Sequence, residues 1–205
     1  MDDVDRSAFI EVMAQALKRF DAQAWAYCLM GDHYDLLLRT RQANLSRLMR
    51  HINGVYTQTF NRRHGFVGHL FQGRFKAILV DAARYLLEVC RYVDLNPVRA
   101  HLVKYPHAYA WRSYRAHTRQ AVRPPWLDSK PLYAQLAPKK SQATAARKYA
   151  EFVAQGAGVN LWDDHVRQQI FLGGDKFIER TQRLAGLSGH DKPRARVNKA
   201  QQRRP

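Results

Sequence analysis

Trp25-Ala-Tyr-Cys-Leu-Met30-Gly-Asp-His33-Tyr-Asp35-Leu-Leu-Leu-Arg39 is the stretch that decides the fold. Residues 25–30 are apolar and aromatic, which favours a strand. The next two residues, Gly and Asp, are typical of a turn, and a second strand follows, so the stretch predicts a β-hairpin. Because residues two apart on a strand point to the same face, His33 and Asp35 are expected to converge on one point.

A helix is predicted on each side of this hairpin. Residues 7–20 place apolar side chains at helical spacing, with Ser7 as the candidate N-cap. Residues 44–61 form a longer amphipathic helix behind the candidate N-cap Asn44. Its apolar face is suited to the core, and its opposite face is basic, as expected of a helix that lies against phosphates.

A further strand and helix are predicted after this helix. Residues 75–80 favour the strand, and Asp81 caps a helix that Pro97 ends. Tyr92 and Asn96 are four residues apart on that helix and share a face about a third of a turn from its apolar stripe. Tyr92 is therefore expected to face a cleft. The order of elements predicts an α+β fold.

The charge of the chain points to a polyanion as partner. Its 205 residues carry a formal net charge of +17, and residues 41–76 contain seven Lys or Arg and no acid. Charge clustered in this way most often meets nucleic acid. The residues expected to contact DNA are Arg47, Arg50, His51, Arg62, Arg63, Arg74 and Lys76.

His33, Asp35 and Tyr92 together suit metal-assisted attack on a DNA phosphate. A phenol is a weak nucleophile at neutral pH, so it needs an electrophilic partner. A divalent ion held at His33 and Asp35 would polarise the phosphate and help to orient it. The alternatives are that His33 is only a turn histidine and that Tyr92 is only a structural tyrosine.

The sequence from about Ser7 to Tyr114 resembles the REP-associated tyrosine transposases, relatives of the single-tyrosine HUH-class insertion-sequence transposases. The motifs that carry this resemblance are Ala26-Tyr-Cys-Leu-Met30, Asn61-Arg-Arg-His64, Gly68-His-Leu-Phe-Gln-Gly-Arg-Phe-Lys76, Arg91-Tyr92-Val and Leu95-Asn-Pro-Val-Arg99.

The resemblance implies a ferredoxin-like antiparallel sheet with helices on one face. It also implies a metal-dependent enzyme of bacterial mobile elements, which nicks and rejoins single-stranded DNA beside palindromic hairpins. Tyr92 would be the nucleophile of transposition. Asn96, one turn further along the helix, would complete a Mg²⁺ or Mn²⁺ site with His33 and Asp35.

The sequence departs from the family pattern at two places. Asp35 stands where the family has a second histidine, and two interpretations stay open: a working oxygen ligand, or a damaged site in a relative that only binds DNA. The chain also begins almost at the first helix, so the first strand of the family sheet is expected to be missing, either because the true start lies upstream or because the protein is truncated.

The expected organisation is a transposase-like domain over residues 1–115, a linker over 116–131, a helical extension over 132–185 and a basic disordered tail over 186–205. No apolar run is long enough to cross a membrane, and the start lacks a secretion signal. Cys28 and Cys90 are expected to be buried free thiols. We therefore expect a cytoplasmic, nucleoid-associated protein, as a monomer or a homodimer. A third hypothesis for the function, an RNA-binding housekeeping protein, is supported only by the positive charge of the chain.

Overall fold

The computed structural model describes residues 1–156 and 171–185. These residues form two compact units, one from residues 1–76 and 87–156, the other from residues 77–86 and 171–185. The expected basic tail, residues 186–205, lies outside the described residues. The segment boundaries expected from the sequence stay a prediction.

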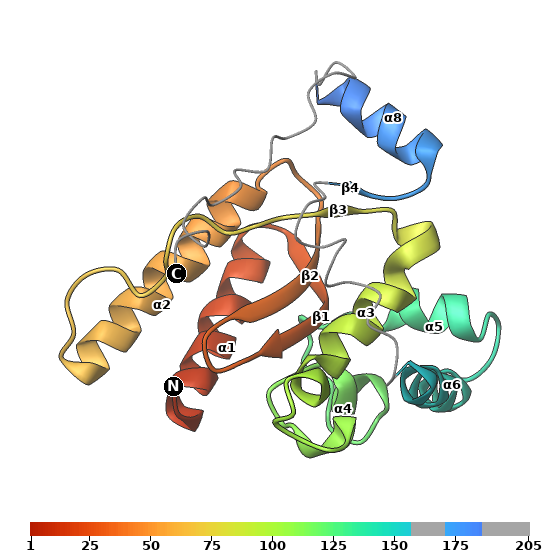
Figure 1. Cartoon of the computed structure of the whole chain (residues 1–205), viewed down its shortest axis with the longest axis horizontal. Helices are drawn as coiled ribbons and strands as arrows, with labels where there is room; N and C mark the ends of the chain where they lie inside the picture. The colour runs from red at the N-terminus through yellow and green to blue at the C-terminus, as the bar shows by residue number, and fades with distance from the viewer. Residues whose placement is uncertain (157–170, 186–205) are drawn as a thin grey trace, which may run out of the picture. The chain divides into compact units, whose positions relative to one another are not determined.

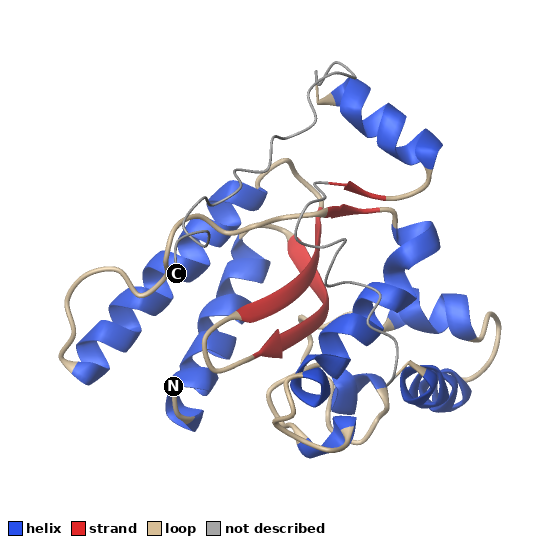
Figure 2. Ribbon diagram, in the orientation of Figure 1, coloured by secondary structure: helices blue, strands red, loops and turns tan. Residues whose placement is uncertain are grey.

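The first unit is built on the predicted hairpin, which the structure confirms (Figure 1). β1 (Ala22–Leu29) and β2 (Tyr34–Thr40) pair antiparallel from Ala22↔Thr40 to Leu29↔Tyr34. Met30 N donates to His33 O at 2.8 Å, which extends the pairing to the turn. Helix α1 (Asp3–Arg19) precedes the hairpin, and α2 (Leu45–His64) follows it. The α+β class is confirmed (Figure 2).

The two faces of the hairpin contact different parts of the first unit. Tyr34, Leu36 and Leu38 of β2 pack into the core that α1 and α2 line. Because side chains alternate along a strand, Asp35 and Leu37 lie on the opposite face. Asp35 there contacts Asn96 of α3 (Ala82–Arg99). Helices α1 and α2 therefore cover one face of the hairpin, and α3 contacts the other at Asp35.

The chain returns to the outer edge of β1 after α3. Leu29 N donates to Trp111 O at 2.9 Å, and Ser113 N donates to Tyr27 O at 3.0 Å. Asp128 N donates to Ala24 O at 2.8 Å further along the same strand. Unpaired strand edges are costly, so these bonds satisfy backbone groups of β1 that β2 does not reach.

Short helices complete the first unit. They are the 3₁₀ turn η1 (Pro106–Ala108), α4 (Tyr114–His117), α5 (Lys130–Leu136) and α6 (Gln142–Gln155). Helices α5 and α6 pack together, and Arg91 of α3 lies over the Phe152 ring of α6 at 4.2 Å. In the second unit β3 (Leu79–Val80) pairs in parallel with β4 (Phe171–Leu172), and α8 (Asp175–Leu184) follows.

Three boundaries expected from the sequence are corrected by the structure. The first helix begins at Asp3 behind the N-cap Asp2, and Ser7 lies inside it. The strand expected over residues 75–80 is reduced to Leu79–Val80. Pro97 lies inside α3, two residues before its end.

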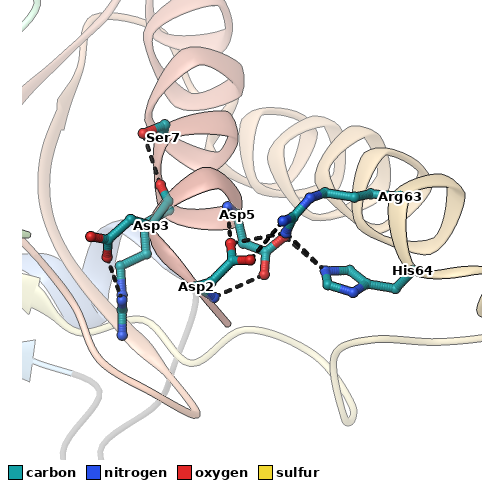
Figure 3. Close-up of polar contacts among 7 residues, drawn as sticks. Asp2, Asp3, Asp5, Ser7, Arg63 and His64 are labelled. Carbon is teal, nitrogen blue, oxygen red and sulfur yellow. Dashed lines mark hydrogen bonds and ion pairs between the residues drawn. The ribbon is translucent and has the colours of Figure 1, made fainter.

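A cluster of charged residues joins the start of α1 to the end of α2 (Figure 3). Asp5, only 2% exposed, accepts hydrogen bonds from Arg63 Nη1 at 2.5 Å and pairs with His64 Nε2 at 2.9 Å. Arg63 Nη2 also donates to Asp2 Oδ2 at 2.6 Å. These partners stabilise the Asp5 carboxylate, so its pKa is lowered although burial acts to raise it. The cluster fixes the two helices to each other.

We predict that Asp5→Asn lowers the free energy of unfolding by about 1–3 kcal/mol at neutral pH, because Arg63 loses a buried charged partner. A carboxyl with a depressed pKa stabilises the fold above its unfolded value of 3.8, and this contribution is lost as the pH falls. Denaturant unfolding between pH 2 and pH 7 should therefore show a shallower acid limb in the variant.

Glu151→Gln is the matched control, because Arg147–Glu151 is an exposed pair at 3.7 Å on α6. It should change the free energy of unfolding by less than about 0.5 kcal/mol. Equal losses of unfolding free energy in the two variants would mean that the charged cluster between α1 and α2 stabilises the fold no more than an exposed ion pair does.

Candidate functional site

The turn of the hairpin positions the first two predicted site residues. His33 precedes β2, and Asp35 is the second residue of that strand. His33 Nδ1 lies 2.7 Å from Asp32 Oδ1, so the ring hydrogen is assigned to Nδ1 and the lone pair to Nε2. His33 Nε2 lies 4.0 Å from Asp35 Oδ2. A lone pair and a carboxylate therefore face the same space, as the i, i+2 spacing predicts.

Helix α3 brings the third predicted residue to this space. Asn96 Nδ2 donates to Asp35 Oδ2 at 2.5 Å and lies 3.3 Å from His33 Nε2. The two partners are 61 and 63 positions earlier in the chain, so only the tertiary fold can create the cluster. We call His33, Asp35 and Asn96 the triad.

The donor set of the triad fits a hard divalent cation. An imidazole nitrogen, a carboxylate oxygen and an amide oxygen suit Mg²⁺ or Mn²⁺, which leave further positions for water and substrate. Asn96 meets the other two through its amide nitrogen, and a half-turn of the amide would present Oδ1 instead. Among the described residues no three of His, Cys, Asp and Glu form a metal cluster, so here the amide is essential to the set.

Burial changes the chemistry of Asp35. Loss of solvent raises the pKa of its carboxyl, while nearby His33, the Asn96 amide and the charge of Arg99 act to lower it. A carboxylate that is costly to keep charged gains most from a cation placed beside it. This environment favours Asp35 as a ligand over Asp35 as a solvated surface residue.

Asp94 holds α3 in place between the two flanking site positions. Its side chain is fully buried, and it accepts hydrogen bonds from Ser113 Oγ and Tyr149 Oη, both at 2.6 Å. Arg112, also buried, donates to the Asp94 carbonyl oxygen. Burial raises the pKa of Asp94 from 3.8 to about 6, against the lowering effect of these donors. The network ties α3 to α6 and to the chain that covers β1.

Tyr92 lies on α3 one turn before Asn96 and is half-buried. The guanidinium of Arg99 lies over its ring, with 3.9 Å from Cζ to the ring centroid. Residues four apart on a helix share a face, so the phenol is on the side of α3 that carries Asn96 to the triad. The predicted nucleophile and the predicted ligands therefore belong to one region of the first unit.

The residues expected to contact DNA fall into two groups. Five are exposed, on the outer face of α2 and in the loop after it: Arg47, Arg50, Arg62, Arg74 and Lys76. The other two have protein partners. His51 is half-buried against Phe20, with 5.5 Å between ring centroids, and Arg63 is paired with Asp2 and Asp5. DNA contact by all seven stays a prediction.

Sequence reasoning missed Asp94, Arg112 and Arg99 as residues of this region. Asp94 lies among apolar helix residues, where an acid is normally excluded from the core, and that anomaly was a readable signal. Arg112 is one of many arginines in a basic chain, and nothing in its spacing distinguishes it. Arg99 ends the motif Leu95-Asn-Pro-Val-Arg99, but the motif alone predicted no role for its side chain.

Comparison with known protein families gives a match over the first part of the chain. Residues 1–96 match the family described as "Transposase IS200 like", which confirms the family predicted from the sequence. Comparisons with curated proteins and with solved structures gave no significant match. In the described residues, no helix has the length and apolar character required to cross a membrane.

We predict that Asp94→Asn changes the pH dependence of stability. The folded protein holds the Asp94 proton up to about pH 6, whereas the unfolded chain loses it near 3.8, so stability falls as the pH rises through this window. The difference amounts to about 3 kcal/mol, and the variant should not show it. Urea unfolding of both proteins from pH 4 to pH 7 measures it, and parallel curves would contradict the assignment.

Proposed function

We propose that this protein, whose residues 1–96 belong to the IS200-like transposase family, nicks and rejoins single-stranded DNA beside palindromic hairpins, with Tyr92 as nucleophile. The family supplies transposase function and DNA binding. The tyrosine chemistry, the metal and the hairpin substrate are the proposal.

One observation carries the proposal. Asn96 from α3 lies within hydrogen-bond distance of both His33 and Asp35 from the hairpin, although more than sixty positions separate it from either of them. The triad gathers one nitrogen ligand and two side chains that offer oxygen ligands beside a helical tyrosine. A structural role alone would not require these residue types on a half-exposed turn.

A Mg²⁺ or Mn²⁺ ion bound by the triad would supply Lewis-acid polarisation of the scissile phosphate. The bond changes involve only the DNA and Tyr92. Tyr92 Oη attacks phosphorus, the bond from phosphorus to the 3′ oxygen breaks, and the 5′ phosphate stays on the tyrosine. The phenolic proton passes to solvent, and the leaving 3′ oxygen becomes a hydroxyl. Attack by another 3′ hydroxyl reverses these changes and completes strand transfer.

The exposed arginines of α2 and its loop support the substrate class. Arg47, Arg50 and Arg62 lie on a helix without any acidic residue, so a phosphate backbone meets no like charge there. The opposite face of the same helix is buried through Leu48 and Ile52, which fixes the helix against the hairpin. Such a helix positions DNA and leaves the chemistry to other residues.

Nicking of a hairpin-flanked single-stranded oligonucleotide, with Mg²⁺ or Mn²⁺, tests the proposed function. Cleavage with a covalent protein–DNA adduct is the expected result. Tight and salt-dependent hairpin binding without cleavage would support the second candidate, a DNA-binding relative with an inactive site, for which the aspartate at position 35 is the motivating observation.

We predict that Tyr92→Phe removes the covalent adduct and leaves hairpin affinity within about twofold, because only the attacking oxygen is lost. Denaturing gels of end-labelled DNA measure the adduct, and a binding titration measures affinity. Tyr85→Phe makes the same change on the same helix and should keep the adduct. The reverse pattern would assign the nucleophile to Tyr85.

We predict that Asp35→Asn weakens Mn²⁺ binding on the order of 10–100-fold, because the charged ligand becomes neutral. Asp21→Asn removes the same charge from an exposed turn and should leave the affinity unchanged. Calorimetric titration of Mn²⁺ into each protein gives the comparison. Equal affinities for the two variants would contradict a metal role for Asp35.

Asp35→His separates the two interpretations of this position. A working aspartate predicts little gain in nicking and an altered preference between Mg²⁺ and Mn²⁺. An increase in nicking rate of more than about tenfold on restoring the second histidine would instead identify Asp35 as damage to the site.

A further inference from the structure

Arg99 is the last residue of α3, and it contacts the predicted nucleophile Tyr92. Its guanidinium lies over the ring of Tyr92, 3.9 Å from the ring centroid. The two residues are seven apart, which is two helical turns and therefore nearly the same face. Its charge also acts on Asp35, where it opposes the rise in pKa that burial causes. Arg99 thus contacts the predicted nucleophile and lies close enough to the triad for its charge to act on Asp35.

The guanidinium of Arg99 has a nitrogen with no acceptor. Arg99 Nη2 is shielded from solvent and has no hydrogen-bond partner among the described residues. Arg91, on the same helix, shows the usual solution: it pairs with Glu88 and donates to Phe152 O. A shielded, unsatisfied cationic N–H group costs free energy unless water, an ion or a ligand supplies the missing acceptor. Arg6 Nε and Arg112 Nη2 are shielded in the same way, and what distinguishes Arg99 is its contact with Tyr92.

We propose that Arg99 binds a non-bridging oxygen of the phosphate that Tyr92 attacks, an inference that rests on the proposed function. A guanidinium presents several N–H donors in a plane, which matches two oxygens of a phosphate. A phosphate at Tyr92 Oη lies at the edge of the ring whose face Arg99 already covers.

The role of Arg99 in the step is electrostatic. Negative charge develops on the non-bridging oxygens as the bond from Tyr92 Oη to phosphorus forms and the bond to the 3′ oxygen breaks. Arg99 stays protonated throughout and forms no covalent bond. Its positive charge stabilises that negative charge without entering the bond changes. Arg99 would thus be a catalytic residue that the ligand pattern alone does not reveal.

The test is a double-mutant cycle between Arg99 and the charge of one phosphate. A hairpin oligonucleotide is made with a single uncharged methylphosphonate at each successive position of its single-stranded flank. The affinity of each oligonucleotide is measured for the full-length protein, for Arg99→Gln and for Arg99→Lys. Lys148→Ala, which removes an exposed charge from α6, is the control.

At one position, methylphosphonate should weaken binding to the unchanged protein and to Lys148→Ala by about tenfold, the usual size for a charged hydrogen bond. The same replacement should weaken binding to Arg99→Gln by less than twofold, because the partner of that phosphate is already absent. Arg99→Lys, which keeps the charge but not the planar donors, should give an intermediate value.

Coupling below about twofold at every position overturns the proposal, whether or not the protein nicks DNA. Because affinity alone is measured, the result does not depend on catalysis. Coupling at one position in a protein that never nicks would uphold the Arg99 contact and refute the transposase chemistry. In an active protein the coupled position should also be the nicking site, and coupling at a different phosphate would overturn the catalytic role of Arg99.

Discussion

The alternation of side chains along β2 is the constraint on which the rest of the structure depends. Tyr34, Leu36 and Leu38 are partly buried against the core that α1 and α2 line, so Asp35 lies on the opposite face. A slip of one residue would move a carboxylate into that core and bring the apolar residues out of it. The strong preference for one register therefore fixes both the core and the place of the triad.

The rotation of α3 is set by a second buried group. Asp94 is held by Ser113 and Tyr149 on the side of α3 that faces away from the triad. Each helical residue turns by about 100°, so Tyr92 and Asn96, two positions to either side, point in roughly the opposite direction. The burial of one carboxylate thus orients both predicted site residues. This explains why an acid is kept at a core position despite its raised pKa.

The sequence predicted the features that depend on local patterns. The hairpin and the helix that follows Asn44 were predicted from periodicity and turn residues, and the structure contains them. The family followed from motifs, and the match over residues 1–96 confirms it. The meeting of His33 and Asp35 with Asn96 was expected from resemblance, whereas the geometry that joins them comes from the tertiary fold.

The features that could not be predicted from the sequence depend on contacts between residues far apart in the chain. Arg63 belongs to a run without acids, yet its carboxylate partners lie 58 and 61 positions earlier. The strand expected over residues 75–80 was wrong in extent: only Leu79–Val80 pair, and Phe75 packs against the core of the first unit. The role inferred for Arg99 depends on its contact with the Tyr92 ring, which the sequence does not show. Long-range charge pairing has no periodic signature.

The central claim is that His33, Asp35 and Asn96 form one divalent-cation site beside Tyr92. Crystals of the unchanged protein grown with Mn²⁺ test it most directly, through anomalous scattering. The account predicts a peak within about 2.0–2.4 Å of His33 Nε2, an Asp35 oxygen and the Asn96 amide oxygen. Ordered density for the three side chains with no peak among them at saturating Mn²⁺ would contradict the account.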